Sequence, residues 1–258
     1  MSRSPAKPLI FMYHSISPYE DDPFQITVTP GRFREHMQWL HRRGLRGTSV
    51  RELLAADAAG AAAGLVGLTF DDGYTDFADH ALPVLLEHGF TATLFALAGR
   101  LGGWNAWDEG GPRKSLLTAD QLREVADAGV EIGSHGHAHV RLPSADPASL
   151  PKEIVDSREV LAAVTGQEVT GFAYPWGDVS QSTVDLVRSA GYDYACAVSH
   201  SELPWRHALP RLYVSDRDRS LRLDLKRVRN RLTTNGFLRP HTPKKVQRPA
   251  EAGKGGPR

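Results

Sequence analysis

Cysteine is almost missing from this chain of 258 residues, in which Cys196 is the only one. No intramolecular disulfide can form, so the class of small disulfide-stapled folds is excluded. A chain of this length buries about three quarters of its unfolded surface and needs no such cross-links. Cys196 lies in the apolar run YACAV, which is typical of a core residue rather than of a catalytic thiol.

Long hydrophobic runs are missing as well. No apolar stretch approaches the roughly 20 residues that a membrane helix needs. The run LIFMY at residues 9–13 is too short for the core of a signal peptide. We therefore expect a cytoplasmic protein without a transmembrane segment.

Acidic residues become scarce from Lys226 onward, where ten Lys and Arg residues stand against a single acid. The rest of the chain holds 21 basic and 29 acidic residues, so a basic segment follows an acidic body. Residues 235–258 are rich in Pro, Gly and basic side chains without an apolar period, and we expect a disordered tail there, after a folded domain of residues 1–234. The basic tail is either a solvated segment or one that contacts an anionic surface, such as a polymer or, by peripheral association, a membrane.

Apolar runs rich in β-branched and aromatic residues alternate with helical patterns along the body of the chain. Strands are predicted at 8–14, 65–70, 91–97, 130–135, 169–175, 192–198 and 208–214. Helices are predicted at 29–44, 75–89, 118–129, 147–166 and 180–191. This alternation is typical of an α/β protein with a parallel sheet. Seven strands favour an irregular (β/α)7 barrel, similar to a TIM barrel, over an open doubly wound sheet.

The predicted helices carry their own boundary signals. Thr29 and Thr118 stand where an N-cap hydroxyl is expected. Five glycines stand where a helix ends in a left-handed residue, namely Gly44, Gly89, Gly129, Gly166 and Gly191. The Gly-rich segment 99–115, with Trp104 and Trp107, is long for a connecting loop and is a candidate substrate loop.

Four clusters fall at the carboxyl ends of predicted strands: His14, the pair Asp71 and Asp72, SHGHAH at 134–139, and YPW at 174–176. In parallel architectures, functional side chains gather at this edge of the sheet. Taken singly, each cluster has a plainer interpretation, because Asp-Gly and YPWG occur in ordinary turns and lone histidines usually serve no catalytic role. Adjacent acids at one strand end and three histidines at another together indicate a metal site.

The histidine run has the spacing of a metal-ligand pair. His135 and His139 are four residues apart, so on a helical turn they would lie on one face and could hold one cation. A carboxylate from another strand end would complete a triad with open coordination positions, which is typical of a catalytic site. The cation would also compensate the repulsion between the carboxylates of Asp71 and Asp72.

The segments TFDDG (69–73), SHGHAH (134–139) and FAYPWG (172–177) resemble the motifs of the polysaccharide deacetylases with a NodB-homology domain, carbohydrate esterase family 4. MYHSI (12–16) and LPRLYV (209–214) are similar to the branch of the poly-N-acetylglucosamine deacetylases. The resemblance covers about residues 8 to 215. It implies that residues 1–234 form a catalytic domain that removes N-acetyl groups from an aminosugar or polysaccharide.

The resemblance also implies roles for individual residues. Asp71 matches the general base, and His14 matches the histidine proposed as general acid. Asp72, His135 and His139 match the ligands of one divalent metal ion, with zinc expected and cobalt or nickel as alternatives. In the implied reaction a water activated by the metal attacks the acetyl carbonyl. Asp71 removes its proton, and His14 protonates the departing amine.

Substrate-binding roles follow from the same resemblance. The backbone N–H of Trp176 matches a donor to the oxyanion. Tyr174 and Pro175 match residues that shape the groove. Trp104 and Trp107 are candidates for stacking on sugar faces. The expected partner is an N-acetylated sugar or glycan and not a nucleic acid.

Three positions depart from the family pattern. Ala173 stands where the family commonly has an arginine, and we predict that Arg211, at a late strand end, orients Asp71 instead. Val140 stands where a proline often follows the second histidine. His137 is an additional histidine, and its use as a substitute metal ligand is an open alternative.

Two other classes of function stay open at this level. Another metal-dependent amidohydrolase could use the two histidines of the H-x-H within HGHAH, and a non-catalytic carbohydrate-binding relative would keep only the groove. The acceptor is also open between a cell-wall glycan, an exopolysaccharide and a lipid- or nucleotide-linked aminosugar.

Overall fold

The main sheet is parallel throughout, in the spatial order β10-β1-β5-β6-β7-β8-β9, with β4 paired to β5. The structure of the chain is a computed structural model, which describes residues 8–198, 203 and 205–234. The strands are β1 (Ile10–Tyr13), β4 (Arg46–Thr48), β5 (Leu65–Phe70), β6 (Thr93–Ala96), β7 (Glu131–Ser134), β8 (Gly171–Ala173), β9 (Tyr194–Cys196) and β10 (Leu212–Tyr213). Two further strands, β2 (Ser15–Ile16) and β3 (Thr27–Val28), pair separately.

The segment that leads into β10 joins the two edges of this sheet. The Leu209 N–H donates to Ala195 O and the Ala197 N–H donates to Leu209 O, each at 2.8 Å, which attaches the segment to β9. Three residues later, β10 pairs with β1. The strands therefore curl around one centre, and the predicted irregular (β/α)7 barrel is confirmed.

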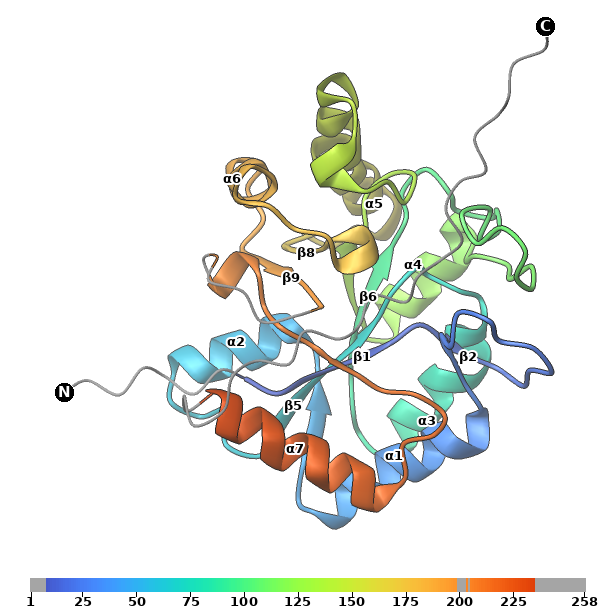
Figure 1. Cartoon of the computed structure of the whole chain (residues 1–258), viewed down its shortest axis with the longest axis vertical. Coiled ribbons are helices and arrows are strands. Elements are labelled where there is room, and N and C mark those ends of the chain that lie inside the picture. Colours follow the sequence, from blue (N-terminus) through green and yellow to red (C-terminus); the bar gives the residue numbers. More distant parts are fainter. Residues whose placement is uncertain (1–7, 199–202, 204, 235–258) are drawn as a thin grey trace, which may run out of the picture.

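The helices lie around the outside of the strands (Figure 1). They are α1 (Pro30–Arg42), α2 (Val50–Ala58), α3 (Leu82–Glu87), α4 (Ala119–Asp127), α5 (Ser157–Thr165), α6 (Gln181–Ser189) and α7 (Ser220–Thr234). Single π-helical turns, η1 (Phe77–Ala81) and η4 (Lys152–Asp156), lead into α3 and α5. Short 3₁₀ turns are η2 (Leu142–Ser144), η3 (Pro147–Ser149), η5 (Pro175–Gly177) and η6 (Trp205–His207). In the described part of the chain, no helix combines the length and apolar character needed to cross a membrane.

The predicted boundary signals are confirmed. The Thr29 side chain accepts from the N–H of Arg32 at the start of α1, and Thr118 forms a capping box with Gln121 at the start of α4. All five predicted glycines have a positive φ, between 62° and 89°: Gly44, Gly89, Gly129, Gly166 and Gly191. These local signals set where the helices stop and hence where the chain turns back to the sheet.

Several elements were not predicted. β4 and α2 form a strand–helix unit between α1 and β5, and β2 and β3 are strands of two residues each. Residues 226–234, interpreted from their charge as the start of a basic tail, are the second half of α7. The predicted disorder of residues 235–258 lies outside the described residues.

Aromatic side chains fill the space between α1 and the strand ends below the site. Tyr13 stacks on Phe70 with ring centroids 5.3 Å apart, and Phe33 and Phe77 meet Phe70 edge-on at 5.7 and 4.8 Å. The site residues that follow β1 and β5 are thus fixed on rigidly packed strands.

Cys196 is fully buried in β9, as predicted for a core residue.

Candidate active site

Five of the predicted site residues lie at the carboxyl ends of strands or beside them. His14 directly follows β1, Asp71 directly follows β5, and His135 directly follows β7. Tyr174 follows β8, and Arg211 directly precedes β10. Because the strands run parallel, side chains that follow them reach the same edge of the barrel.

Asp72, His135 and His139 form a buried group that could hold a metal ion. The Asp72 Oδ1 atom lies 3.4 Å from His135 Nε2 and 3.3 Å from His139 Nε2. One potential ligand atom from each residue lies within 4.8 Å of the other two. An oxygen and two nitrogens that converge in this way suit a divalent cation such as zinc.

The hydrogen bonds of these residues agree with a cation between them. His135 Nδ1 lies 2.8 Å from the carbonyl oxygen of Ala173, so this nitrogen carries the proton and Nε2 is left with a lone pair that faces Asp72. Among the described residues, the buried Asp72 Oδ1 atom has no hydrogen-bond donor. Burial lowers the pKa of His139, which favours the neutral imidazole that a metal ligand needs. Two acceptors that face each other in a buried place are stabilised by a cation.

The loop that carries the two histidines is not helical, so the prediction from their spacing was wrong in this respect. After β7 the chain passes through Gly136 and His139, whose φ angles are 87° and 65°. These left-handed residues turn the loop, and the two imidazoles converge without a helical turn. The spacing thus pointed to two histidines that do converge, but it did so through a helical turn that does not occur.

Glu153, in η4, holds this loop and was missed in the sequence. Its buried Oε2 atom accepts from the backbone N–H groups of His137 and Ala138 at 2.8 and 3.0 Å. Both donors lie between His135 and His139, the two histidines of the candidate metal group. The loop conformation thus depends on a carboxylate far from it in sequence.

His137 is not part of the candidate metal group that the described residues form. Its backbone carbonyl accepts from the N–H of Gly99, and its ring packs so close to Gly99 that a Cβ there would lie 2.3 Å from Nε2. The alternative of His137 as a substitute ligand is therefore not supported. Its ring instead joins this loop to the segment after β6.

Arg211 forms a two-pronged ion pair with Asp71. Its Nη1 and Nη2 atoms donate to Asp71 Oδ1 and Oδ2 at 2.6 and 2.8 Å. The guanidinium also donates to Thr69 Oγ1 and to Ala197 O, each at 3.2 Å. His14 Nε2 lies 4.0 Å from Asp71 Oδ2. The carboxylate plane is thereby fixed between an arginine and a histidine.

The ion pair controls the charge of Asp71. Burial alone would raise the pKa of its carboxyl group. The charge and hydrogen bonds of Arg211, together with the nearby imidazoles of His135 and His14, outweigh burial and leave that pKa below its ordinary value. Asp71 is therefore ionised at neutral pH. Ala173, where the family commonly has an arginine, packs in an apolar cluster on β8. Arg211 directly precedes β10, so it reaches Asp71 from the side of β5 opposite to β8.

Unusual backbone conformations concentrate at this site. Among the described residues, four that are not glycine have a positive φ: Gln25, Asp72, His139 and Trp176. Two of them belong to the candidate metal group, and Trp176 is the residue proposed to donate its N–H to the oxyanion. Such conformations cost of order 1–3 kcal/mol each and persist where the surrounding structure imposes them.

Trp107 and Trp176 pack against the ring of His139. The Trp107 indole stacks on this imidazole with centroids 4.5 Å apart, and the Trp176 ring lies at 4.9 Å. Trp176 Nε1 donates to the backbone carbonyl of His139 at 3.2 Å. Trp104, by contrast, is 44% exposed and lies under the guanidinium of Arg113. The candidate substrate loop thus places one ring against the candidate metal group and one at the surface.

Tyr174 lies in the core. Its side chain is fully buried, and its hydroxyl donates to the carbonyl of His207 at 2.9 Å. Pro175 is also buried, at the start of η5. The burial of Tyr174 does not support a direct contact with substrate. Its side chain instead packs in the core beneath the turn that carries Trp176.

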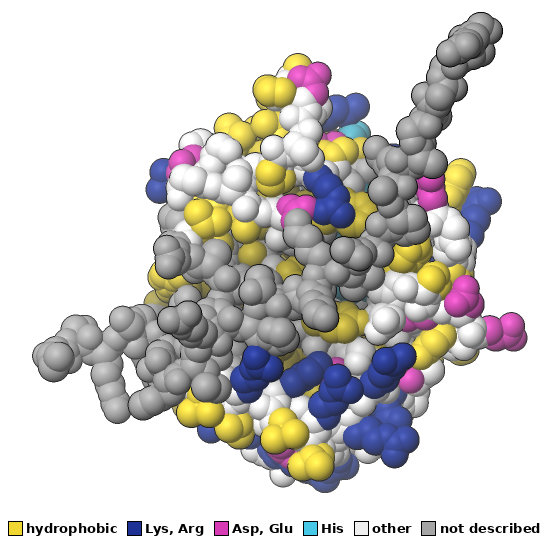
Figure 2. Space-filling view, in the orientation of Figure 1, with side chains coloured by type: hydrophobic (Ala, Val, Ile, Leu, Met, Phe, Trp, Pro, Cys, Tyr) yellow, Lys and Arg dark blue, Asp and Glu magenta, His cyan; other side chains and the backbone are white. Residues whose placement is uncertain are grey.

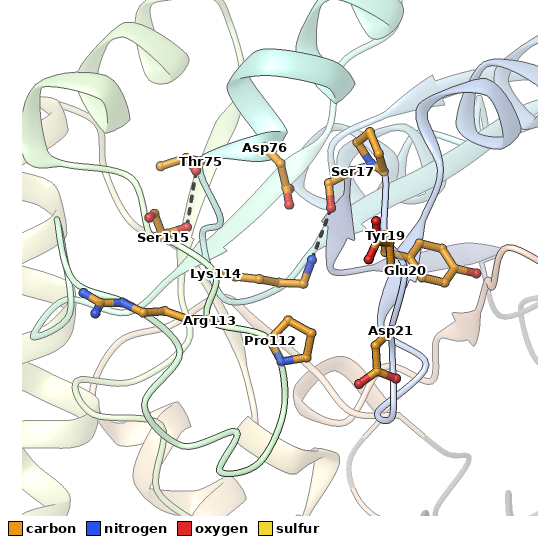
Figure 3. Close-up of a pocket in the computed structure, with 11 residues that line it drawn as sticks. Ser17, Tyr19, Glu20, Asp21, Thr75, Asp76, Pro112, Arg113, Lys114 and Ser115 are labelled. Atoms are coloured by element: carbon orange, nitrogen blue, oxygen red, sulfur yellow. Dashed lines mark hydrogen bonds between the residues drawn. The ribbon is translucent and has the colours of Figure 1, made fainter.

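A cavity of about 550 Å³ is formed by three segments that each follow or contain predicted site residues (Figure 3). Residues 17–21 follow His14, residues 75–76 follow Asp72, and residues 112–115 belong to the loop with both tryptophans. Lys114 extends from its loop toward Ser17 and donates to its hydroxyl at 3.2 Å. A cavity with convergent polar groups is a candidate for binding a polar ligand.

Comparison with known proteins decides the family. Residues 59–195 match the family model described as "Polysaccharide deacetylase", which is more than half of the chain. The chain belongs to the polysaccharide deacetylase family. The match contains Asp71, Asp72, His135 and His139, as the motifs predicted.

Individual relatives agree with this assignment. YxkH of Bacillus subtilis strain 168, named as a polysaccharide deacetylase, is 32% identical over 193 residues, which cover 74% of this chain and 64% of YxkH. The poly-beta-1,6-N-acetyl-D-glucosamine N-deacetylase of Staphylococcus aureus is 21% identical over 74% of this chain and 68% of its own length. This chain thus spans slightly less than two thirds of YxkH.

Solved structures of deacetylases have the same fold. The Streptococcus pyogenes deacetylase PplD, solved in complex with acetate, superposes with a TM-score of 0.73 at 24% identity, over 86% of this chain and 98% of PplD. A de-N-acetylase from Aggregatibacter actinomycetemcomitans gives a TM-score of 0.70 at 19% identity, over 85% and 99% of the two chains. At these identities the likeness shows the shared fold of the polysaccharide deacetylases.

Proposed function

We propose that this chain is a metal-dependent carbohydrate N-deacetylase, which hydrolyses the acetamide of an acetylated aminosugar or glycan. The observation that carries the proposal is the buried Asp72-His135-His139 group next to Asp71, whose carboxylate is held by Arg211. Membership of the polysaccharide deacetylase family supports it. We assign the activity to a domain of residues 1–234.

Asp72, His135 and His139 would hold one divalent cation. Their set of one oxygen and two nitrogens suits zinc, with cobalt and nickel as alternatives. Such a cation, when bound, supplies a Lewis acid for the acetyl carbonyl and lowers the pKa of water. The hydrogen bond from His135 to Ala173 O fixes the ring so that Nε2 faces Asp72 and would be available to a cation held there.

Asp71 is the proposed general base, which takes a proton from the attacking water. Despite burial, Arg211 together with His135 and His14 holds the pKa of Asp71 below its ordinary value, so the carboxylate is ionised and can accept a proton at neutral pH. The two-pronged contact with Arg211 fixes the direction of the carboxylate lone pairs. The general base is thereby oriented before substrate binds.

His14 is the proposed general acid, which donates a proton to the departing amine. An amide nitrogen leaves poorly as an anion, so the reaction needs such a donor. The side chain of His14 is 18% exposed, whereas that of Asp71 is 3% exposed, so His14 is the more accessible of the two. The backbone N–H of Trp176 is proposed to donate to the oxyanion, an interaction worth about 2.7–4 kcal/mol in comparable sites.

We further propose that the substrate is a glycan rather than a single sugar. Trp107 beside His139 and the exposed Trp104 offer two aromatic faces on one loop. The cavity around Lys114, with polar groups from three segments, would take a neighbouring sugar unit. A longer substrate would then bind by contacts beyond the reacting acetamide.

The direct test is acetate release from a panel of acetylated substrates, including β-1,4- and β-1,6-linked N-acetylglucosamine oligomers, with metal content measured in parallel. Asp71→Asn is expected to lower turnover by about 10²–10⁴-fold with unchanged metal content. His135→Ala is the matched variant, and it is expected to lose both metal and turnover.

Other outcomes would favour the alternatives. Turnover at the wild-type rate in Asp71→Asn would refute its role as base. A metal-loaded protein that binds glycan oligomers but releases no acetate would indicate a non-catalytic carbohydrate-binding relative. Hydrolysis of amides that are not attached to a sugar would indicate an amidohydrolase of another kind.

A further inference from the structure

Helix α7 presents an apolar face to solvent. Leu221, Leu225, Val228 and Leu232 are 73%, 63%, 54% and 38% exposed. At 3.6 residues per turn these four side chains project within about 60° of one another, so they form one continuous stripe along the helix. Exposed apolar residues are common singly, but a stripe of this length marks an interaction surface.

The opposite face of α7 is attached to the barrel. Leu223 is fully buried in the main core cluster. On the flank of the helix that also carries Arg231, Asp224 accepts from Arg43 of α1 at 2.7 Å. The Lys226 ammonium donates to Tyr213 O at 2.8 Å. The exposed stripe is therefore the outer face of a packed helix and not a frayed chain end.

Basic side chains line both sides of the apolar stripe. Helical periodicity places Arg222 and Arg229 on one side and Arg231 on the other. Arg229 and Arg231 are exposed, and Arg222 is 58% exposed although it also pairs with Asp218. Figure 2 shows Lys and Arg side chains gathered over the part of the surface that α7 forms. The single acid of the helix, Asp224, is engaged by Arg43.

These two properties select among three occupants of the surface. A second copy of α7 would bury the leucines but would bring like charges together along both flanks, which opposes association. A soluble polyanion would match the arginines but would leave the leucines in water. A bilayer with anionic lipids satisfies both, because the leucines enter the boundary of the acyl chains while the arginines reach the lipid phosphates.

We propose that α7 docks the protein on a lipid bilayer that carries anionic headgroups, with the helix in the plane of the membrane surface. Leu221, Leu225, Val228 and Leu232 provide the inserted face. Arg222, Arg229 and Arg231 provide the contacts with phosphate. The proposal is independent of the deacetylase activity, because none of these residues belongs to the candidate active site.

The test is co-sedimentation of the full chain with vesicles of phosphatidylcholine, with and without phosphatidylglycerol, at physiological salt. Binding is expected only to vesicles that contain phosphatidylglycerol, and it should weaken as salt increases. Leu225→Ser combined with Val228→Ser is expected to lower the bilayer affinity by about tenfold or more. Leu186→Ser is the matched control, because Leu186 lies on α6 and is also exposed, at 42%.

A second pair of variants tests the charges. Arg229→Gln with Arg231→Gln is expected to weaken binding to the anionic vesicles, whereas Arg188→Gln on α6 is expected to leave it unchanged. Melting curves of all variants should match the wild type, because every substituted side chain faces solvent. A variant that melts early is replaced by the corresponding alanine substitution at the same position.

Four outcomes would overturn the proposal. The first is no binding to anionic vesicles. The second is binding that the Leu225→Ser and Val228→Ser changes leave intact, which would assign it to another basic segment. The third is binding to a soluble polyanion as tight as to the anionic vesicles, again unaffected by the Leu225→Ser and Val228→Ser changes. The fourth is a dimer in light scattering that these two substitutions dissociate without any vesicle binding, which would assign the face to a second copy.

Discussion

The carboxyl ends of the strands and the outer face of α7 treat charge and apolar surface in opposite ways. At the strand ends, Asp71 is buried and neutralised by Arg211. On α7, arginines project from the exposed sides of the helix and leucines face solvent. The first arrangement is preorganised and complete apart from its proposed cation. The second arrangement leaves its charges and apolar side chains exposed, and it is complementary to an extended surface such as the proposed bilayer.

The comparison also separates structural from interaction roles. A buried ion pair is costly to break because the remaining charge stays without compensation, whereas an exposed side chain can change with little effect on the fold. Substitutions at the buried ion pair should therefore lower the free energy of unfolding much more than substitutions on the outer face of α7.

Arg211→Met would leave the carboxylate of Asp71 buried without its partner. We expect the free energy of unfolding to fall by about 3–5 kcal/mol, measured by urea denaturation. The control is the double variant Arg211→Met with Asp71→Asn, which removes both charges and should be more stable than Arg211→Met alone. Equal stability of the single and double variants would show that the pair is not what holds this end of the barrel.

Glu153→Ala would release the loop between the two histidines of the candidate metal group. Because Glu153 Oε2 accepts from the N–H groups of His137 and Ala138, its loss should lower zinc affinity by about 10–100-fold. Glu153→Gln retains an oxygen acceptor and should recover most of that affinity in a metal titration. If Glu153→Ala bound zinc as tightly as wild type, Glu153 would have no positioning role.

Leu225→Ala and Leu223→Ala form the mildest and most direct comparison within α7. Leu225 is 63% exposed, and its replacement should change the free energy of unfolding by less than about 0.5 kcal/mol. Leu223 is fully buried two residues earlier, and its replacement should cost about 2–5 kcal/mol. Similar costs at both positions, measured by thermal unfolding, would mean that the outer face of α7 is covered by the protein itself.

Local signals explain which parts of the fold could be predicted. β5 occupies the predicted residues 65–70, because its apolar run ends abruptly at two aspartates. The N-caps Thr29 and Thr118 and the C-terminal glycines act within a few residues, so the sequence reports them directly. α7 was missed because its apolar residues face outward among many basic ones, a composition that is also typical of a solvated tail.

The candidate site also contains parts that local sequence signals predict and parts that depend on distant contacts. The candidate metal group of Asp72, His135 and His139 lies within the recognised motifs, so motif resemblance pointed to the three residues that the fold brings together. The contact of Glu153 with the histidine loop depends on two left-handed residues that bend the loop toward η4. Sequence spacing does not reveal such a bend, which is why a helical turn was predicted there instead.

The burial of Cys196 has a practical consequence for labelling. Burial raises the pKa of this thiol to about 12, so its reactive thiolate is scarce at neutral pH. The native chain therefore behaves toward maleimide and nitroxide reagents as if it had no cysteine. A probe attached through Leu225→Cys would be the single reporter in the molecule, and its spectrum would measure how deeply that position enters a bilayer.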